Sequence, residues 1–487
     1  SILDQTSEFG GSWETDEAVG PRSNSRFNEE HFDDDFSQIS LSLSGDLTDN
    51  VEYIFTASSF DRDVNYTYDY SEYVEYYNYD GPTYTCDYYD YYYYYNISGC
   101  QDPRMSYTQI DNHERDSYEV RIQSKGDSGF QWILGAFSES SKRDYEIAYL
   151  WPGANPGNLS WNVPNGQWWN LDNTREEEVE AFFGEGSLSV NDKTKLTLGF
   201  RSYDQDTMVD AKDGYFGVFD GVEKVFNSND SGVVPKVNIA HNINDDVMVY
   251  GTYSEGFRAS GINRVRPAQT AFIPETYDSD YLESLEFGFK STLADGKLIL
   301  NGAYFMMDWS DFQSTTYNLA YSTVAFVDNV GNAEINGLEL DATYKPNDTL
   351  TLSGYIVSND PSLSEDYYDV SGVLQANSGN RLAYVPELSY VLGLDKVLSI
   401  FGMPGYVSVD YSYTGDRYTS QANDLKLPSY AIANMRVGVE SGNRSMEVFI
   451  SNLTDENGYQ SRYDDFGDIR RTQNRPKVIG LRFKYRY

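Results

Sequence analysis

The chain ends in a strictly alternating stretch, Lys477-Val-Ile-Gly-Leu-Arg-Phe-Lys-Tyr-Arg-Tyr487. Every second position is apolar or aromatic, at Ile479, Leu481, Phe483, Tyr485 and Tyr487. The positions between them are Gly480, Arg482, Lys484 and Arg486. Side chains of a β-strand point alternately to opposite faces, so the stretch predicts a strand with one apolar and one charged face. Its length of about ten residues exceeds that of a usual soluble strand and suits a strand that crosses a membrane.

The same alternation recurs through most of the chain and predicts about 17 strands. They are expected at 35–45, 50–60, 117–125, 129–140, 174–190, 193–206, 232–243, 246–257, 282–292, 297–308, 334–345, 349–358, 382–396, 402–414, 429–440, 444–453 and 477–487. The fold class that this predicts is all-β.

The connections between these strands alternate in length. Short turns include 46–49, 191–193, 244–245, 294–296, 346–348 and 442–443, and long connections include 61–116, 141–173, 207–231, 258–281, 309–333, 359–381 and 454–476. Tight turns at one end and long loops at the other are typical of a transmembrane antiparallel up-and-down β-barrel. We expect the first strand, 35–45, to run inward because a short turn follows it. An even strand number then requires further strands before residue 1.

Composition excludes two other classes of protein. The 487 residues include 36 Lys+Arg and 76 Asp+Glu, a net charge of −40. Phosphate backbones select for Lys and Arg, so no nucleic-acid partner is expected. No stretch approaches 18 uncharged apolar residues, so no transmembrane helix is expected. The first residues have neither a basic nor an apolar region of a signal peptide, as in a mature chain or a fragment.

Several motifs carry a family resemblance. They are Tyr250-Gly-Thr-Tyr-Ser-Glu-Gly-Phe-Arg258 followed by Ala259-Ser-Gly-Ile-Asn263, Pro274-Glu-Thr-Tyr277 with Leu285-Glu-Phe-Gly-Phe-Lys290, Asn332-Ala-Glu-Ile-Asn-Gly-Leu-Glu-Leu340, Ile450-Ser-Asn-Leu-Thr-Asp455 and the terminal Tyr487. In order and spacing, over about residues 35–487, they resemble the TonB-dependent receptors of bacterial outer membranes. Each motif is weak alone, and their succession carries the resemblance.

The resemblance implies a barrel of 22 strands, an N-terminal plug and a TonB box. We find neither plug nor TonB box, and 22 − 17 = 5 strands are lacking, so residues 1–487 are expected to be an N-terminally incomplete barrel. The implied function is active import of a scarce, bulky nutrient, such as a siderophore–iron complex or a glycan, across a Gram-negative outer membrane. The energy-coupling protein TonB would bind the missing N-terminal region. The alternative is a plug-less passive porin or a surface-adhesion barrel.

The connection 61–116 is rich in tyrosine, with 15 Tyr among residues 66–95. Tyrosine offers a flat apolar face and a polar tip, which suits contact with a ligand or partner, so Tyr88, Tyr91 and Tyr93 are candidate binding residues. The alternative is a loop that packs on itself. Cys86 and Cys100 enclose 13 residues here. We predict that they form a disulfide in an oxidising compartment, with two free thiols as the alternative.

A second aromatic group lies in the connection 141–173, which holds four of the seven tryptophans. Trp151, Trp161, Trp168 and Trp169 are candidate ligand contacts. The alternative is an aromatic girdle at the membrane interface. A girdle is expected to place one aromatic residue at each strand end rather than four in one loop.

Arg258, Arg264 and Arg266 stand out in an acidic chain as candidates for binding an anionic substrate. They could equally pair with neighbouring acids such as Glu255 or Asp278. The run 33–35, Asp-Asp-Asp, is expected to be a solvated loop, with cation binding as the alternative.

We expect no enzymatic activity and no cofactor. His31 and His113 fall in expected loops and His241 in a strand, and no nucleophile motif or metal-ligand spacing accompanies them. The outer face is expected to contact membrane lipid. The acidic loops are expected to contact anionic lipopolysaccharide through divalent cations.

Overall fold

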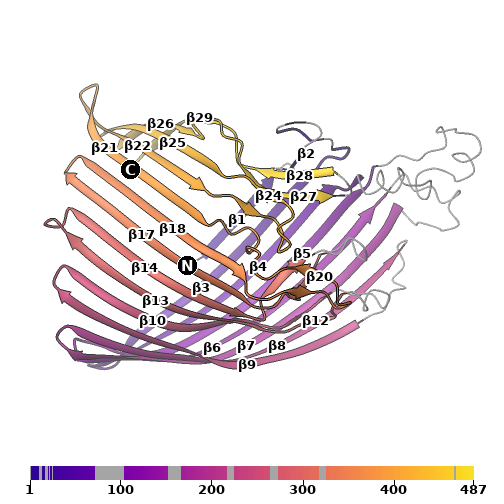
Figure 1. The fold of residues 1–487 in the computed structure, drawn as a ribbon, viewed down its shortest axis with the longest axis horizontal. Coiled ribbons are helices and arrows are strands. Elements are labelled where there is room, and N and C mark those ends of the chain that lie inside the picture. Colours follow the sequence, from indigo (N-terminus) through magenta and orange to yellow (C-terminus); the bar gives the residue numbers. More distant parts are fainter. Residues whose placement is uncertain are drawn as a thin grey trace, which may run out of the picture.

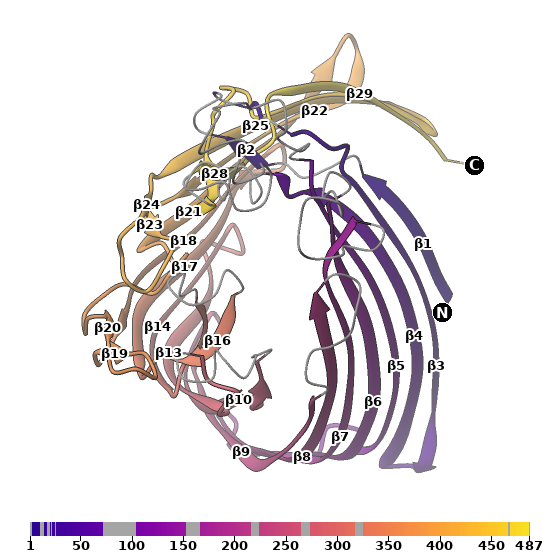
Figure 2. The same ribbon diagram turned by 90° about the vertical axis from the view of Figure 1, so that its right-hand side faces the viewer.

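The structure is a computed structural model that describes residues 2–9, 14–16, 20, 22–24, 26–71, 104–151, 166–215, 224–263, 273–316, 325–465 and 468–486. One antiparallel sheet of 18 strands dominates it. Figures 1 and 2 show this sheet curling round into a barrel with β1 and β29 at its two edges, so the predicted all-β barrel is confirmed. Among the described residues, no helix is long and apolar enough to cross a membrane.

The 18 strands follow one another around the sheet in chain order. They are β1 (Ile2–Phe9), β3 (His31–Thr48), β4 (Val51–Asp69), β5 (Ser106–Ser124), β6 (Phe130–Leu150), β7 (Gln167–Asn191), β8 (Thr194–Tyr215), β9 (Lys224–Asn244), β10 (Val247–Arg258), β13 (Asp280–Leu293), β14 (Leu298–Ser310), β17 (Ala333–Asn347), β18 (Leu350–Leu363), β21 (Leu388–Ile400), β22 (Met403–Thr414), β25 (Tyr430–Ser441), β26 (Arg444–Ser451) and β29 (Val478–Tyr485).

The expectation that 35–45 is the first strand is wrong. β1 precedes it and pairs antiparallel with β3, from Ile2 opposite Ile39 to Phe9 opposite Phe32. Polar residues occupy most of β1, so its sequence lacks the apolar alternation that identifies the other strands. The 17 expected strands therefore become 18, an even number. That further strands precede residue 1 stays a prediction.

Strands β3 to β9 are 18 to 25 residues long and extend into segments that were expected to be loops. The connection expected at 61–116 is shorter than predicted, because β4 continues to Asp69 and β5 begins at Ser106. Likewise β6 continues to Leu150 and β7 begins at Gln167, inside the connection expected at 141–173. In these extensions the outward face is charged or polar, as at Asp61 and Glu114, and the aromatic side chains, such as Tyr68 and Tyr107, lie on the inward face. The apolar outward face that identifies the membrane-crossing parts is therefore lost there.

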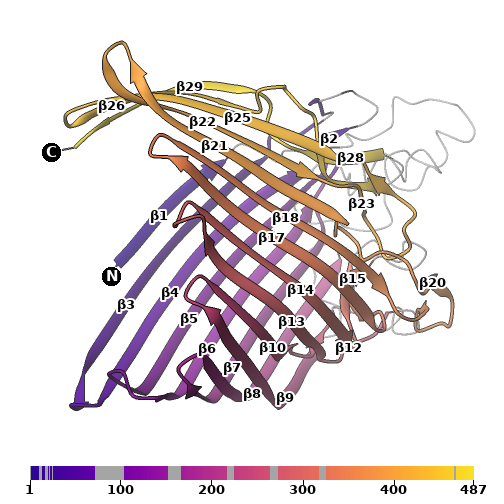
Figure 3. The ribbon, with the colours of Figure 1, turned by 60° about the vertical axis from the view of Figure 1, so that its left-hand side comes forward.

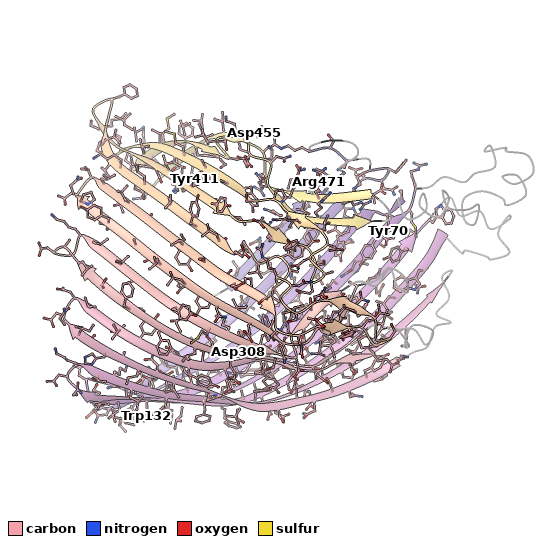
Figure 4. The ribbon with its side chains drawn as sticks, in the orientation of Figure 1. Tyr70, Trp132, Asp308, Tyr411, Asp455 and Arg471 are labelled. Atoms are coloured by element: carbon pink, nitrogen blue, oxygen red, sulfur yellow. The ribbon has the colours of Figure 1, made fainter. Side chains whose placement is uncertain are left out.

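The two ends of the barrel differ as expected. Short connections join β3–β4, β5–β6, β7–β8, β9–β10, β13–β14, β17–β18, β21–β22 and β25–β26 at one end (Figure 1). The long connections gather at the other end, where the described parts form β2 (Glu14–Asp16), β11 (Gly261–Ile262), β12 (Thr276–Tyr277), β15 (Gln313–Thr316), β16 (Phe326–Asn329), β19 (Tyr367–Tyr368), β20 (Leu374–Ala376), β23 (Arg417–Tyr418), β24 (Lys426–Leu427), β27 (Tyr459–Asp465) and β28 (Asp468–Gln473). Figure 4 places Trp132 near the short-turn end and Tyr70 at the long-connection end.

The outward face of the sheet is apolar. Large side chains exposed there include Leu41, Val120, Leu134, Phe182, Leu198, Ile239, Phe287, Leu338 and Phe483. The inward face is polar and partly paired within the wall. Arg482 donates to Glu447 Oε1 at 2.7 Å, and Arg436 donates to Ser408 Oγ at 3.1 Å. These two inward-facing cations thus have partners on neighbouring strands of the wall.

Aromatic rings cover glycines on neighbouring strands of the wall. Tyr406 lies opposite Gly438, where an added Cβ would meet the Tyr406 ring at 2.5 Å. The Tyr406 hydroxyl reaches one strand further and donates to Glu447. The same cover recurs at Gly45, Gly135, Gly232, Gly288, Gly302, Gly337 and Gly480. An aromatic side chain over a strand glycine pins the register of that strand pair.

Candidate functional site

Four positively charged or titratable side chains form one row across adjacent strands of the inward face. Arg62 lies opposite His113, His113 opposite Arg143, and Arg143 opposite Arg175, on β4, β5, β6 and β7. Lipid-facing residues of these strands, such as Tyr118, Leu134 and Phe182, have the opposite parity. These four residues are called the arginine row below.

Each arginine of the row is oriented by a carboxylate. Arg62 donates from Nε and Nη2 to the two oxygens of Asp34 at 2.8 and 2.7 Å. Arg143 grips Asp111 in the same bidentate way, with Nε 2.8 Å from Oδ1. These bonds use one edge of each guanidinium and leave Nη1 outside the ion pair. The Arg62 and Arg143 side chains are 41% and 49% exposed, so part of each cation remains available to a ligand.

Arg175 is paired within its own strand. Its Nε and Nη2 both donate to Oε1 of Glu177, at 3.0 and 2.6 Å. Residues two apart on a strand share a face, so this ion pair also faces inward. The arginine row thus presents three partly exposed guanidinium groups whose direction is set by neighbouring carboxylates.

A row of aromatic side chains lies further out on the same face. Tyr68 is opposite Tyr107, Tyr107 opposite Tyr149, and Tyr149 opposite Trp169, on β4 to β7. Ring centroids of Tyr107 and Tyr149 are 5.1 Å apart, and those of Tyr149 and Trp169 are 5.4 Å apart. These four residues are called the aromatic row below. It is six residues along β4 from the arginine row, or roughly 20 Å at about 3.3 Å per residue.

Polar groups connect the two rows. Both Tyr66 and Tyr107 donate hydroxyl hydrogen bonds to Oε1 of Gln109, at 2.5 Å. The Gln109 amide then donates to Asp111 at 3.3 Å, and Asp111 binds Arg143. The chain of hydrogen bonds holds the aromatic row in a defined position relative to the arginine row.

The arrangement suits one class of ligand. A row of partly exposed guanidinium groups binds carboxylate, phenolate or other anionic oxygens. Aromatic faces above it bind flat or aromatic groups. No group of three or more His, Cys, Asp or Glu side chains in the described ranges is placed to hold a metal ion. The chemistry of the wall therefore suits an anionic, partly aromatic molecule.

Two of the expected tryptophans are packing residues in this structure. Trp151 and Trp169 belong to a buried cluster with Met105, Ile147 and Leu171. They are 1% and 6% exposed, too little for a girdle that faces lipid. Trp169 is nevertheless one end of the aromatic row. A direct ligand contact for either tryptophan stays a prediction. Trp168 lies in β7, and its side chain is outside the described part.

Arg258 has an acidic neighbour as its partner, which was the alternative to substrate binding. The neighbour is Asp280, opposite Arg258 on β13, rather than Glu255 or Asp278. Arg258 Nε lies 2.9 Å from Asp280 Oδ2, and Nη2 donates to the Gln313 carbonyl at 2.8 Å. Its guanidinium carbon is 4.8 Å from the centroid of the Trp309 ring. Arg258 therefore joins β10, β13 and β15, and a substrate role stays a prediction.

The remaining candidates lie outside the described residues. They are Tyr88, Tyr91, Tyr93, Trp161, Arg264 and Arg266, together with the predicted disulfide pair Cys86 and Cys100.

His31, His113 and the aspartate run lie in strands, contrary to the expected loops, and His241 lies in β9, a strand as expected. His31 is in β3, and His113 is in β5 within the arginine row. The aspartate run lies in β3, where Asp34 pairs with Arg62 while Asp33 and Asp35 point to the other face. Sequence reasoning missed the arginine row because its members come from four separate strands. The only local sign of the row is that each strand carries an Arg or His, at 62, 113, 143 or 175, with polar residues on either side of it.

Residues of the sequence motifs fasten the outer connections. Asn263 accepts a hydrogen bond from the Val327 amide at 2.8 Å and donates to the Pro274 carbonyl at 3.1 Å. Asn452 accepts from the Glu456 amide at 2.8 Å and donates to the Arg475 carbonyl at 3.0 Å. These asparagines satisfy backbone groups that the strands leave unpaired.

Two carboxyl groups of the outer connections have shifted pKa values. Hydrogen bonds from Lys426 and Arg381 hold the pKa of Asp416 below its usual value, against the opposing effect of burial. Burial raises the pKa of Asp328, although the Tyr367 hydroxyl donates to Oδ2 of its carboxyl at 2.7 Å.

Comparison with known proteins agrees with this architecture. Residues 2–453 match the family model "TonB dependent receptor-like, beta-barrel". The pesticin receptor of Yersinia enterocolitica is 21% identical over 358 residues, covering 72% of this chain and 48% of the relative. The pesticin receptor of Yersinia pestis is 23% identical over 243 residues, 49% of this chain and 33% of the relative. The chain thus spans between a third and about half of the length of these relatives.

Solved structures share the fold. The ferric yersiniabactin uptake receptor FyuA from Yersinia pestis has a TM-score of 0.73 at 15% identity, covering 95% of this chain and 63% of that chain. The ferric-catecholate import receptor Fiu from E. coli K12, in its closed form, has a TM-score of 0.70 at 14% identity, covering 99% and 71%.

Proposed function

Because the chain belongs to the TonB-dependent receptor β-barrel family of integral outer-membrane proteins, we propose that it is the barrel of an active transporter. Its proposed cargo is an anionic metal chelate with aromatic or phenolate groups, and a ferric siderophore is the first candidate. The arginine row beneath the aromatic row is the observation that carries the proposal. Glycans are less favoured, because a neutral sugar would gain little from three guanidinium groups.

Energy coupling is part of the proposal. Transport would depend on TonB, which would bind a region of the protein outside these 487 residues. Contact with lipopolysaccharide through divalent cations stays a prediction, as does the absence of enzymatic activity. Acidic residues of β3 to β8 do lie on the outward face beyond the apolar belt, for example Asp61, Asp63, Glu114, Asp116, Glu176, Glu178, Asp204 and Asp206.

The binding site is tested with Arg143→Gln in the full-length protein. Loss of a charge-assisted hydrogen bond removes about 1.5–3 kcal/mol, so affinity for a ferric tris-catecholate should fall about tenfold or more. Arg143→Lys keeps the positive charge but loses the planar, bidentate arrangement of N–H donors, so it should give an intermediate affinity. Arg436→Gln is the matched control, because Arg436 also faces inward but lies on β25, away from the row. Equal affinities for all variants would contradict the assigned site.

The rival function, a passive porin or adhesion barrel, makes a different prediction. Uptake of the radiolabelled iron chelate into cells should stop when TonB is deleted. A porin would continue to admit small solutes without TonB and would show a stable open conductance in a planar bilayer. Uptake that does not depend on TonB would favour the porin.

A further inference from the structure

One of the eight short connections differs in composition from the others. Seven contain a charged residue or asparagine, namely Asp49-Asn50, Lys125–Gly129, Asp192-Lys193, Asp245-Asp246, Ala294–Lys297, Asp348-Thr349 and Gly442-Asn443. The eighth, between β21 and β22, is Phe401-Gly402, flanked by Ile400 and Met403. Polar residues suit a turn at a water-facing rim, so an apolar turn at this rim needs another explanation.

The backbone of this turn also disfavours its residue. Phe401 and Gly402 both have positive φ, 53° and 81°, as a two-residue type I′ hairpin requires. Asn, Asp and Gly suit these positions, whereas a bulky side chain in the left-handed region costs about 1–2 kcal/mol. The Phe401 ring does not recover this cost inside the protein, because the residue is 95% exposed. A strained, fully exposed aromatic side chain points to a contact outside the chain.

The turn continues the lipid-facing surface. Leu394, Leu398 and Ile400 share one face of β21, opposite the face of Asp395, which lies across from Ser408 on the inward side. Leu394 and Leu398 are each 38% exposed. In Figures 2 and 3 the β21–β22 turn projects beyond the ring of strands, away from the interior. The lipid-facing surface of β21 therefore reaches the tip at Phe401, with Lys396 as the one charged residue on that face of the strand.

We propose that the β21–β22 turn is a membrane-interface anchor that binds phospholipid. Phe401 inserts among the acyl chains of the inner leaflet, at the short-turn end that faces the periplasm in barrels of this kind. The Phe401 ring has no polar group and gains free energy on entering hydrocarbon, while the backbone of the turn can stay hydrated at the interface. Lys396, on the same face, donates to the Thr349 hydroxyl at 2.7 Å, so its ammonium group has a partner in the neighbouring β17–β18 turn.

Site-specific photocrosslinking tests the proposal. A benzoylphenylalanine residue replaces Phe401 in the full-length protein in cells, and the same residue replaces Asn443 in the β25–β26 turn as the matched control. After irradiation, mass spectrometry should find a phospholipid adduct at Phe401 and none at Asn443. A protein adduct at Phe401 would identify a periplasmic partner instead and would overturn the proposal, as would a position without any adduct.

A second experiment uses natural side chains. Vesicles containing a phospholipid with a photoreactive diazirine in its acyl chain label the refolded protein. The peptide that contains Phe401 should be labelled in the parent protein and several-fold less in Phe401→Asn. Asn suits the left-handed position, so this variant should fold at least as well as the parent. Labelling of β29, which bears the lipid-facing Phe483, should be equal in both. Undiminished labelling of the turn in Phe401→Asn would also overturn the proposal.

Discussion

Arg258 and Asp280 form an ion pair in which only the acid is buried. The Asp280 side chain is 1% exposed and that of Arg258 is 47% exposed. Asp280 also accepts a hydrogen bond from the backbone N–H of Gln313 at 3.0 Å, so one carboxylate holds the ends of β10, β13 and β15 together. A buried carboxylate needs such partners, because an unpaired charge in this place is costly.

Asp280→Asn should loosen the outer connection that follows β10. The amide can still accept one hydrogen bond but no longer neutralises Arg258, so we expect a loss of about 1–2 kcal/mol, reduced by the solvent that reaches Arg258. Hydrogen exchange of residues 258–263 and 311–316 should become faster. Asp245→Asn, in a short turn at the far end, is the control and should leave this exchange unchanged. Unchanged hydrogen exchange in Asp280→Asn would show that Asp280 does not hold these strand ends together.

Gly438→Ala should destabilise the barrel wall. The new Cβ would lie 2.5 Å from the Tyr406 ring, which must move and lose its hydrogen bond to Glu447. Overpacking of this kind costs about 1–3 kcal/mol. Gly256→Ala is the matched control, since no atom lies within 4 Å of a Cβ there. Urea titration of the refolded barrel in detergent should show a lower midpoint only for Gly438→Ala.

Lowering the pH should loosen the connection between β22 and β25, because the ion pairs of Asp416 are lost. The pKa of Asp416 is lowered in the folded protein, so its contribution to stability is complete above the pKa of an unfolded aspartate, about 3.9. It is lost as the pH falls through the lower folded value. Pepsin should therefore cleave residues 416–427 faster as the pH falls below about 4. Asp416→Asn should be cleaved at a rate that depends less on pH, and a parallel dependence in both proteins would refute the assignment.

Phe483→Arg should impair insertion into the membrane. Phe483 is 69% exposed on the lipid face, opposite Met446. Arginine on this face costs about 2–4 kcal/mol near the bilayer midplane and less toward its edges. Lys484→Gln, one residue away on the inward face, should fold normally. The measurement is the yield of heat-modifiable barrel after refolding into lipid vesicles, and equal yields would mean that the two faces are reversed.

Local patterns located most of the strands because one face of each contacts lipid. The stretch ending at Tyr487 and its counterparts alternate wherever an apolar face meets a polar one, and this predicts both strand and orientation. The pattern weakens where the outward face is polar. For this reason the alternation does not reveal β1, and it predicts a loop for the outer parts of β4 and β5, where the aromatic side chains face inward.

The motif residues were recognised, but their roles were not. Asn263 and Asn452 marked the family resemblance, yet only their hydrogen bonds show that they satisfy backbone groups in the outer connections. Arg258 was a binding candidate because of its charge. Its partner Asp280 is 22 residues away in sequence, and the two meet because β10 and β13 pair.

The sequence by itself determined the all-β class, the alternation of short and long connections and the separation of a lipid face from a polar face. These properties follow from the period of two in residues that are neighbours in the chain. Only the tertiary structure decided that Arg62, His113, Arg143 and Arg175 share one row beneath the aromatic residues. Strand register places them there, and a shift of one residue in any strand would turn its member outward. That register is set by packing and hydrogen bonding between neighbouring strands across the wall.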